Sequence, residues 1–256
     1  MLPAPTHFCR RCLLALPLLL LSSGLRGEEV LVAVAANFAA PMTELAQRFE
    51  RQSGHELQLS FGASGRFFAQ ISNGAPYQVF LSADQDKPRR LVDSGLALAD
   101  SRFTYALGAL VLWSADAELD LSGPEVLRGS TYERLALANP RLAPYGQAAV
   151  EVLESLGLAE PSRSRWVMGE NVAQTYQFVA SGNASLGFVA LSQVSAGGNL
   201  ARGSGWLVPT HLHTPIRQDA VLLTRAADCA ACRQFLDFLR TPEAAEVIRD
   251  FGYAVE

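Results

Sequence analysis

Lysine is almost absent from this chain of 256 residues: Lys87 is the only one, and arginine supplies the other 20 basic residues. The formal net charge is −4, and no group of arginines marks a basic patch. A nucleic-acid-binding protein needs a basic face, so we expect no nucleic-acid partner. Charged residues make up only 18% of the chain and hydrophobic residues 49%, which excludes a disordered protein and indicates a globular one with a substantial core.

The sequence also lacks a hydrophobic run long enough to cross a bilayer as a helix, which takes about 20 residues. The apolar run Cys12–Leu21 is shorter, follows two arginines and is followed by small residues. A basic start, a short apolar run and a small-residue exit are typical of a secretory signal peptide. We therefore predict that residues 1–27 form a signal peptide, with cleavage after Gly27 or, as the alternative, after Gly24. Its removal changes the formal net charge from −4 to −7.

Cysteine is scarce, with four residues in all, and the mature chain keeps only Cys229 and Cys232. A single Cys-x-x-Cys pair has no second pair with which to complete a zinc site. In an exported chain, a local disulfide at a helix start is the favoured state of such a pair. A redox-active pair is the alternative.

Short apolar stretches alternate with segments of helical spacing along the mature chain. The predicted strands cover residues 30–35, 57–61, 78–82, 106–113, 134–138, 166–168, 186–191 and 220–224. The first three predicted helices end near residues 53, 71 and 94. The later ones cover residues 146–156, 173–181, 232–240 and 242–251. This alternation, with short loops, indicates an α/β architecture with parallel strands. Because no proline- or serine-rich linker separates two halves, we expect lobes joined by crossover strands near residues 106–111 and 208–217.

Four loops place a small or polar residue directly before a predicted helix, at residues 36–37, 63–65, 144–146 and 170–172. A helix start exposes unpaired N–H groups and carries about half a positive charge. Several such starts together can bind an anion without lysine or arginine, and ligands of open α/β sheets lie beyond the carboxyl ends of the strands. The alternative is that Asn37 and Ser64 only cap their helices, which is a common role of these residue types.

Many segments match one known family, and they follow its order over the whole mature chain. The most specific is Gly74–Asp84, which reads Gly-Ala-Pro-Tyr-Gln-Val-Phe-Leu-Ser-Ala-Asp; the others are 34–38, 60–65, 138–140, 144–146, 186–189, 241–245 and 251–253. In these segments the chain resembles the periplasmic molybdate-binding proteins of ABC importers. The resemblance implies a two-lobed type II periplasmic binding fold, in which each lobe is a mixed, mainly parallel sheet flanked by helices. Lobe I would contain residues 28–108 and 213–256, and lobe II residues 109–212.

The resemblance also implies which residues hold an oxyanion between the lobes. Asn37 stands where the family has serine or asparagine, so it would give a backbone N–H and a side-chain donor. Ser64 matches the family's serine and would give its N–H and its hydroxyl. Tyr145 and Val172 match positions that contribute backbone N–H groups from the second lobe.

The chain departs from the family pattern at Ala190, where many members have a tyrosine whose hydroxyl contacts the ligand. Members with asparagine at the first position often lack this tyrosine as well. We therefore expect Asn37, together with the backbone N–H of Ala36, to compensate for the missing hydroxyl.

These residue types suit molybdate, a tetrahedral dianion with no proton at neutral pH, which needs only hydrogen-bond donors. Burying it without a counter-charge requires a hydrogen bond to every oxygen. Phosphate carries a proton and would favour an acidic acceptor, which none of the four positions provides. From the resemblance we expect a monomeric periplasmic protein, without cofactor or enzymatic activity, that captures molybdate and tungstate and delivers them to an ABC permease.

Three alternatives remain at the level of the sequence. The ligand could be another oxyanion such as sulfate. A secreted hydrolase could use Ser64, although residues 62–65 are not the Gly-x-Ser-x-Gly motif and the mature chain has only three histidines. His211 and His213 could together bind a metal ion, but no further ligand stands at suitable spacing. We therefore expect no site for a free metal cation. Molybdenum would be bound only as its oxyanion.

Overall fold

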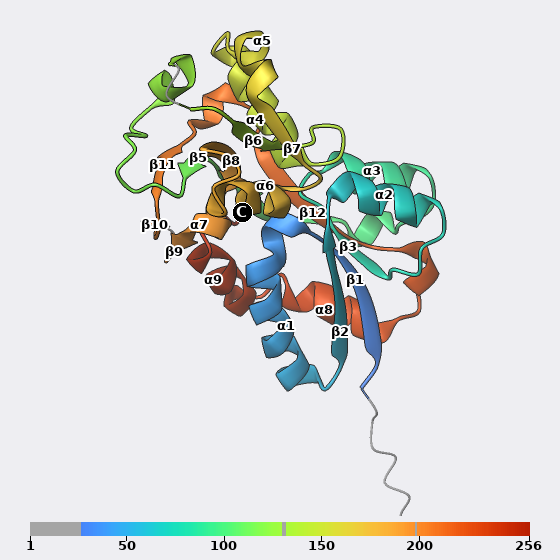
Figure 1. The fold of residues 1–256 in the computed structure, drawn as a ribbon. Helices are drawn as coiled ribbons and strands as arrows, with labels where there is room; N and C mark the ends of the chain where they lie inside the picture. The colour runs from blue at the N-terminus through green and yellow to red at the C-terminus, as the bar shows by residue number, and fades with distance from the viewer. Residues whose placement is uncertain (1–26, 130–131, 198) are drawn as a thin grey trace, which may run out of the picture.

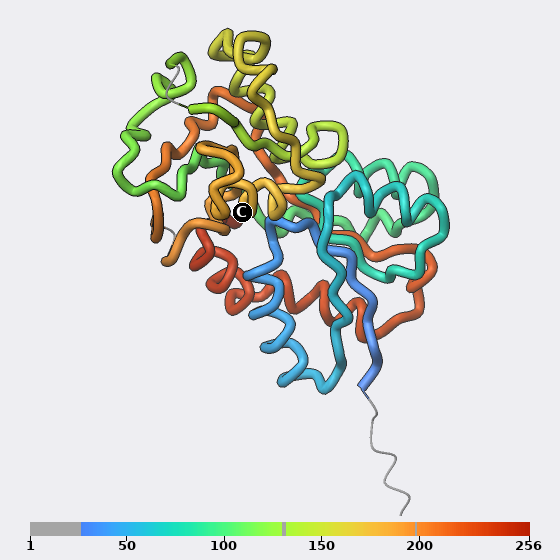
Figure 2. The backbone as a smooth tube through the Cα atoms, viewed as in Figure 1, coloured from blue at the N-terminus to red at the C-terminus, as the bar shows by residue number. Residues whose placement is uncertain are grey.

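The computed structural model describes residues 27–129, 132–197 and 199–256, and it contains two five-stranded sheets flanked by helices (Figure 1). The predicted signal peptide lies outside the described residues, apart from Gly27. The first sheet is built from the start and the end of the chain and the second from its middle (Figure 2). The part built on the first sheet is termed lobe I and the part built on the second lobe II.

The sheet of lobe I has the strand order β2-β1-β3-β12-β4. Its strands are β1 (Glu29–Ala35), β2 (Glu56–Gly62), β3 (Val79–Leu81), β4 (Phe103–Gly108) and β12 (Ile216–Leu222). β1 runs parallel to both β2 and β3, with Val30 opposite Leu57 and Ala33 opposite Phe80, whereas β12 is antiparallel to β3 and β4. Because β1, β2 and β3 point the same way, the loops that follow them meet at one edge of the sheet.

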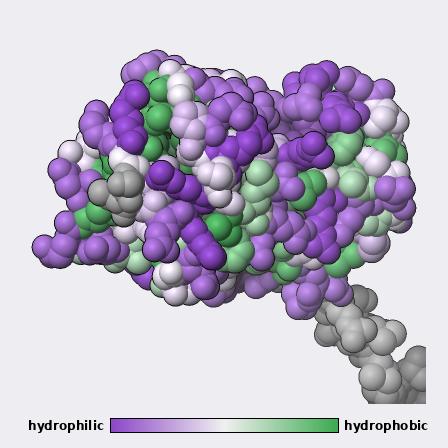
Figure 3. Space-filling model, turned by 45° about the horizontal axis from the view of Figure 1, so that its top comes forward, coloured by the Kyte–Doolittle hydropathy of each residue, from purple (hydrophilic) through white to green (hydrophobic). Residues whose placement is uncertain are grey.

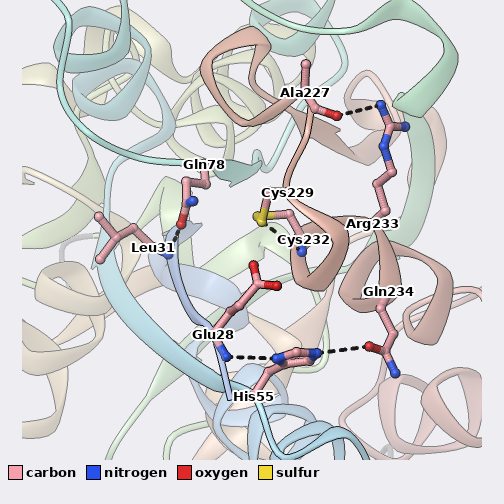
Figure 4. Close-up of a disulfide and its surroundings, with 9 residues drawn as sticks. All are labelled: Glu28, Leu31, His55, Gln78, Ala227, Cys229, Cys232, Arg233 and Gln234. Carbon is pink, nitrogen blue, oxygen red and sulfur yellow. Dashed lines mark hydrogen bonds between the residues drawn. A yellow bond between two sulfur atoms is a disulfide. The ribbon is translucent and has the colours of Figure 1, made fainter. Parts of the chain in front are cut away.

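Five α-helices cover this sheet: α1 (Ala39–Ser53), α2 (Ser64–Ser72), α3 (Asp86–Asp93), α8 (Ala230–Phe238) and α9 (Pro242–Asp250). α1 buries Met42, Leu45 and Phe49, whose spacing of three and four residues puts them on one face. It ends at Gly54, whose φ of 75° lies in the left-handed region that glycine adopts without a steric penalty. A disulfide joins Cys229, the residue before α8, to Cys232 in its first turn, and Cys229 Sγ also accepts a hydrogen bond from the backbone N–H of Cys232 (Figure 4).

The sheet of lobe II has the order β11-β5-β8-β6-β7. Its strands are β5 (Leu110–Ser114), β6 (Leu135–Ala138), β7 (Trp166–Gly169), β8 (Leu186–Ala190) and β11 (Ser204–Leu207). β6 is parallel to β7 and β8, and β5 is antiparallel to β8 and β11. The helices of this lobe are α4 (Pro144–Ser155), α5 (Ala159–Ser162), α6 (Val172–Ala180) and α7 (Leu191–Val194), and a two-stranded ribbon joins β9 (Ser195–Ala196) to β10 (Asn199–Leu200).

Six short 3₁₀ helices complete the described elements: η1 (Ala36–Phe38), η2 (Ala99–Ser101), η3 (Pro124–Arg128), η4 (Arg163–Arg165), η5 (Thr210–Leu212) and η6 (Thr224–Ala226). The first of them, η1, continues directly into α1 and carries Asn37 at its middle position. The turn that leaves β1 is therefore tighter than an ordinary α-helical start, and all three of its residues are buried.

The α/β fold class and most of the predicted elements are confirmed, and the parallel pairings occupy one half of each sheet. The prediction of one strand over residues 106–113 is wrong, because the chain is broken at Ala109 into β4 and β5. The break has a topological cause: β4 pairs with β12 in lobe I, while β5 pairs with β8 and β11 in lobe II. β11 was not predicted, because its residues alternate too little to indicate a strand.

Hydrophilic residues cover most of the face shown in Figure 3, and hydrophobic residues occur there in small separate patches. The large hydrophobic side chains that are exposed come from separate elements and loops: Phe61, Leu96, Met168, Leu200 and Leu207. Among the described residues, no helix combines the length and the apolar character that a bilayer-crossing segment requires.

The lobes meet where the chain passes from β4 to β5 and where it returns into β12. The Gly65 N–H of lobe I donates to the Leu142 carbonyl of lobe II at 2.8 Å. Arg66 and Glu170 form an exposed ion pair beside this contact, with Nη1 2.6 Å from Oε1. The lobes are therefore in direct contact on the side where the loops after β1, β2 and β6 lie.

The last residues of the chain also belong to this junction. The Leu107 N–H of β4 donates to the Ala254 carbonyl at 2.8 Å, and the Ala254 N–H donates to the Leu107 carbonyl at 3.1 Å. Arg217 of β12 pairs with the side chain of Glu256. The carboxyl terminus thus lies against both strands that connect the lobes.

Three tyrosine hydroxyls are buried at the junction, those of Tyr105, Tyr145 and Tyr253. The Tyr253 hydroxyl donates to the Asn37 backbone carbonyl at 2.7 Å and lies 2.9 Å from the hydroxyl of Ser192. Burial raises the pKa of Tyr253 to about 12. Burial is also the main reason why the pKa values of Tyr105 and Tyr145 lie well above 10.

These shifts predict a loss of stability at alkaline pH. A phenol whose pKa is higher in the folded than in the unfolded state gives its full contribution below pH ~10, and this contribution is lost as the pH rises toward about 12. For Tyr253 alone the loss amounts to about 2 kcal/mol at pH ~12. Urea unfolding measured between pH 8 and pH 11.5 should show a shallower decline for Tyr253→Phe than for the unaltered protein. Equal declines for the two proteins would contradict the assignment.

Candidate functional site

A small cavity of about 200 Å³ lies between the lobes. All twelve residues that line it are uncharged: Ala35, Ala36, Asn37, Gly62, Ala63, Ser64, Ala83, Ala143, Pro144, Tyr145, Asn171 and Val172. The cavity is much smaller than the neighbouring cleft between the lobes, which measures about 650 Å³. The cavity therefore suits a small ligand, and any charge on that ligand must be stabilised by neutral groups.

Four helix starts supply backbone donors around this cavity. Ser64 and Val172 are the first residues of α2 and α6, and Tyr145 is the second residue of α4. Asn37 is the second residue of η1. None of these N–H groups has an acceptor one turn earlier in its own helix, and each carries part of the positive end of a helix dipole. The structure thus brings all four residues singled out in the sequence to one place, and Ala36 with them.

Ser64 is 1% exposed and holds its hydroxyl in a defined orientation. Its Oγ accepts a hydrogen bond from the Ala83 backbone N–H at 2.9 Å, which leaves the hydroxyl hydrogen available for another acceptor. α2 has no side-chain cap, so the capping role considered for Ser64 is not what the structure shows. Asn171 is the residue that caps a helix here: its Oδ1 accepts from the N–H groups of Ala173 and Gln174, both at 3.0 Å.

Asn37 is 3% exposed and does not cap a helix either. Its Nδ2 donates to Gln218 Oε1 at 2.7 Å and to the Tyr253 hydroxyl at 3.0 Å. Its backbone carbonyl accepts from the hydroxyls of Ser192 and Tyr253. In this arrangement both hydrogens of the side-chain amide are engaged within the protein, so the side-chain donor expected from the sequence does not face the cavity.

Sequence reasoning missed these partners of Asn37. Gln218 and Tyr253 lie 181 and 216 residues further along the chain. One indication of a polar contact here was present in the sequence, the pair Gln218 and Asp219, which directly precedes the apolar end of β12. Both residues are buried. Polar side chains buried in a strand require partners, so such a pair marks a polar junction.

Ala190, at the position where the resemblance places a tyrosine in many members, is fully buried at the end of β8. Its N–H donates to Gln193 Oε1 at 3.0 Å, and Gln193 Nε2 donates to the Val172 carbonyl at 3.2 Å. Gln193 thus fixes the start of α6 relative to β8, without a hydroxyl from Ala190 itself.

A larger cleft of about 650 Å³ lies next to the cavity and shares Ala83 and Pro144 with it. Three carboxylates line this cleft, those of Asp84, Asp86 and Glu151, against the single basic residue Arg217. This charge balance repels anions, and the smaller neutral cavity is the better anion site although it has less volume.

The arrangement does not support the hydrolase or the metal site considered from the sequence. In the part of the chain that the structure describes, no histidine is hydrogen-bonded to Ser64; His55, for example, contacts the N–H of Glu28 and the side chain of Gln234. A nucleophilic serine needs such a base. The same described residues contain no group of three or more His, Cys, Asp and Glu side chains that could hold a metal ion.

Comparison with known proteins gives consistent results. Residues 30–254 match the family described as "Bacterial extracellular solute-binding protein". The molybdate-binding protein ModA of Azotobacter vinelandii is 50% identical over 96% of this chain and 98% of its own length, and that of Rhodobacter capsulatus is 49% identical over 89% of both chains. The solved structure of the periplasmic molybdate-binding protein of Azotobacter vinelandii superposes with a TM-score of 0.85 and 42% identity, over 89% of this chain and 99% of that one.

The resemblance found in the sequence is thereby confirmed, and so is the two-lobed fold that it implied. The matched family covers both lobes and the neutral cavity between them, where the structure offers hydrogen-bond donors but no histidine-activated nucleophile. The chain belongs to the bacterial extracellular solute-binding proteins and is a binding protein for transport, not an enzyme.

Proposed function

We propose that the protein captures molybdate, and with it tungstate, in the cavity between its lobes. The observation that carries this proposal is a neutral cavity into which the N–H groups of helix starts from both lobes converge. Such a site stabilises a fully ionised tetrahedral anion by hydrogen bonds alone. The two relatives named for molybdate binding support the same ligand.

Within this proposal, Asn37 and Ser64 bind the anion from lobe I, and Tyr145 and Val172 bind it from lobe II. Backbone N–H groups act at all four positions, and Ser64 adds its hydroxyl. The N–H of Ala36 is a further donor beside them. Phosphate is disfavoured, because no carboxylate lines the cavity to accept its proton.

We further propose that residues 28–108 and 213–256 move as one lobe and residues 109–212 as the other. The protein is exported by its signal peptide, residues 1–27, acts in the periplasm as a monomer and delivers its ligand to an ABC permease. The disulfide between Cys229 and Cys232 supports an oxidising compartment, since cytosolic thiols are kept reduced.

A thermal-shift screen against molybdate, tungstate, sulfate and phosphate tests the ligand. A ligand that binds only the folded protein, present at about 100 times its dissociation constant, stabilises it by ~2.7 kcal/mol. We expect upward shifts with molybdate and tungstate only. A shift with sulfate and none with molybdate would move the proposal to sulfate, and turnover of an ester that Ser64→Ala abolishes would favour the hydrolase.

Substitutions in the cavity test the site. Ser64→Ala removes a hydrogen bond to a charged ligand and should weaken molybdate binding by ~1.5–3 kcal/mol, measured by titration calorimetry. Asn37→Ala should also weaken binding, because it removes the amide that ties the turn with the Asn37 backbone N–H to Gln218 and Tyr253. Ser72→Ala, at the exposed end of the same helix α2, is the matched control and should leave the affinity unchanged. Unchanged affinity in both cavity variants would refute the assignment.

Closure of the lobes is tested at Gly65. A Cβ at this position would lie 2.9 Å from the Leu142 carbonyl oxygen and 3.0 Å from Leu142 Cα in the opposite lobe, so Gly65→Ala should keep the lobes apart. A ligand that bridges both lobes favours the closed form by its differential affinity for it. Small-angle scattering should therefore show a smaller radius of gyration with molybdate, and a weaker effect and lower affinity for Gly65→Ala. A profile that saturating molybdate leaves unchanged in the unaltered protein would count against a site shared by the lobes.

A further inference from the structure

Two buried polar atoms at the junction have no hydrogen-bond partner in the described structure, the Tyr145 hydroxyl and Gln218 Nε2. They are neighbours, since a Cβ placed on Gly108 would lie 2.1 Å from the first and 2.8 Å from the second. Tyr145 is 2% exposed and Gln218 is fully buried, so water does not readily replace the missing partners. Leaving buried polar groups unpaired costs free energy, and such a pair needs an explanation.

The amide atom beside the Tyr145 hydroxyl is Gln218 Nε2, a donor, so the hydroxyl hydrogen has no acceptor there. The phenol oxygen is able to accept from Nε2, but no hydrogen bond joins the two atoms in this geometry. The other end of the same amide, Gln218 Oε1, receives two donors, Asn37 Nδ2 at 2.7 Å and the Tyr105 hydroxyl at 3.1 Å. Two donors thus share Gln218 Oε1. The Tyr145 hydroxyl lies near the other end of the amide, Nε2, which cannot accept a hydrogen bond.

A half-turn of both amides removes this mismatch without changing their shape. Gln218 Nε2 then donates to Asn37 Oδ1 and to the Tyr105 oxygen, and the Tyr105 hydroxyl keeps the Ser82 carbonyl, now 3.3 Å away, as its acceptor. Gln218 Oε1 then lies beside the Tyr145 hydroxyl and gives it an acceptor, once the two atoms approach to hydrogen-bond distance. In this arrangement Asn37 Nδ2 is the one donor of the set that still lacks an acceptor.

The same half-turn changes what Asn37 offers to the cavity. As described above, both hydrogens of its amide are directed to Gln218 and Tyr253, and the free end of the amide is its oxygen. After the half-turn the free end is Nδ2, which is a donor. A fully ionised tetrahedral anion has no proton to give and accepts hydrogen bonds only from donors.

We propose that Gln218 is a positioning residue for the anion: in the ligand-bound protein it turns together with Asn37, so that Asn37 Nδ2 faces the ligand and the Tyr145 hydroxyl donates to Gln218 Oε1. This inference rests on the proposed function of the cavity. Tyr145 would then have two roles. Its backbone N–H donates to the ligand, and its side-chain hydroxyl connects lobe II to β12 by a hydrogen bond to Gln218. Neither Gln218 nor that hydroxyl touches the anion.

Titration calorimetry with molybdate tests the inference. Tyr145→Phe keeps the backbone N–H and removes only the hydroxyl, and we expect it to weaken binding about fivefold; Gln218→Met should weaken it about tenfold. Tyr132→Phe is the matched control, a buried tyrosine of lobe II whose hydroxyl donates to the Leu127 carbonyl instead, and it should leave the affinity unchanged. If the Tyr145 hydroxyl stayed unpaired in the bound protein, Tyr145→Phe would leave the dissociation constant unchanged and raise the melting temperature, which would overturn the inference.

A double-mutant cycle separates positioning from a general structural effect. If Gln218 acts through Asn37, Gln218→Met should weaken binding in the unaltered protein but have little further effect in the Asn37→Ala background. Equal losses in the two backgrounds would overturn the inference. Failure of the unaltered protein to bind molybdate would instead refute the proposed function, so the two failures are distinguishable.

Discussion

Under the proposed function, the cavity between the lobes has to stabilise an anion without a single opposite charge. All of its lining residues are neutral, and the chain as a whole carries a formal net charge of −4, which repels anions at long range. The attraction must therefore be local and must come from oriented dipoles. Each helix start contributes about half a positive charge, and α2, α4 and α6 reach the cavity from different directions. Such a site depends on the position of every donor, because no flexible lysine or arginine can adapt to a misplaced ligand.

This dependence on position explains features that surround the cavity. The start of α4 lies so close to the end of β6 that a Cβ on Gly146 would be 2.1 Å from the Ala138 carbonyl oxygen, a distance that only glycine permits. The turn that carries Asn37 is held from behind by two hydroxyls on its carbonyl. These hydroxyls are uncharged. The raised pKa of Tyr253 keeps its hydroxyl protonated at every physiological pH. The junction thus fixes the donors with further dipoles rather than with charges.

The sequence was sufficient to predict the parts of the site that depend on local structure. A strand, a small or polar residue and a helix follow one another closely along the chain, and this order located the four loops that line the cavity; the resemblance to the family then singled out Asn37, Ser64, Tyr145 and Val172 within them. It was not sufficient for contacts between distant segments, such as that of Asn37 with Gln218, because nothing in either segment shows that the two will meet. The division of residues 106–113 between two sheets has the same cause, since strand propensity is local and the choice of partner strand is not. The orientation of the Asn37 amide depends on the whole network and could not be predicted from any one segment.

The pairing of Ala254 with Leu107 places the carboxyl terminus against the strand from which the chain enters lobe II. Nearby, Glu256 contacts Arg217 on the return strand β12. If the lobes move as proposed, an affinity tag or a fluorescent protein fused after Glu256 would lie at the joint between them and would hinder this motion. The start of β1 lies far from the strands that connect the lobes (Figure 1), so the segment just before it is the better point of attachment for immobilisation or labelling.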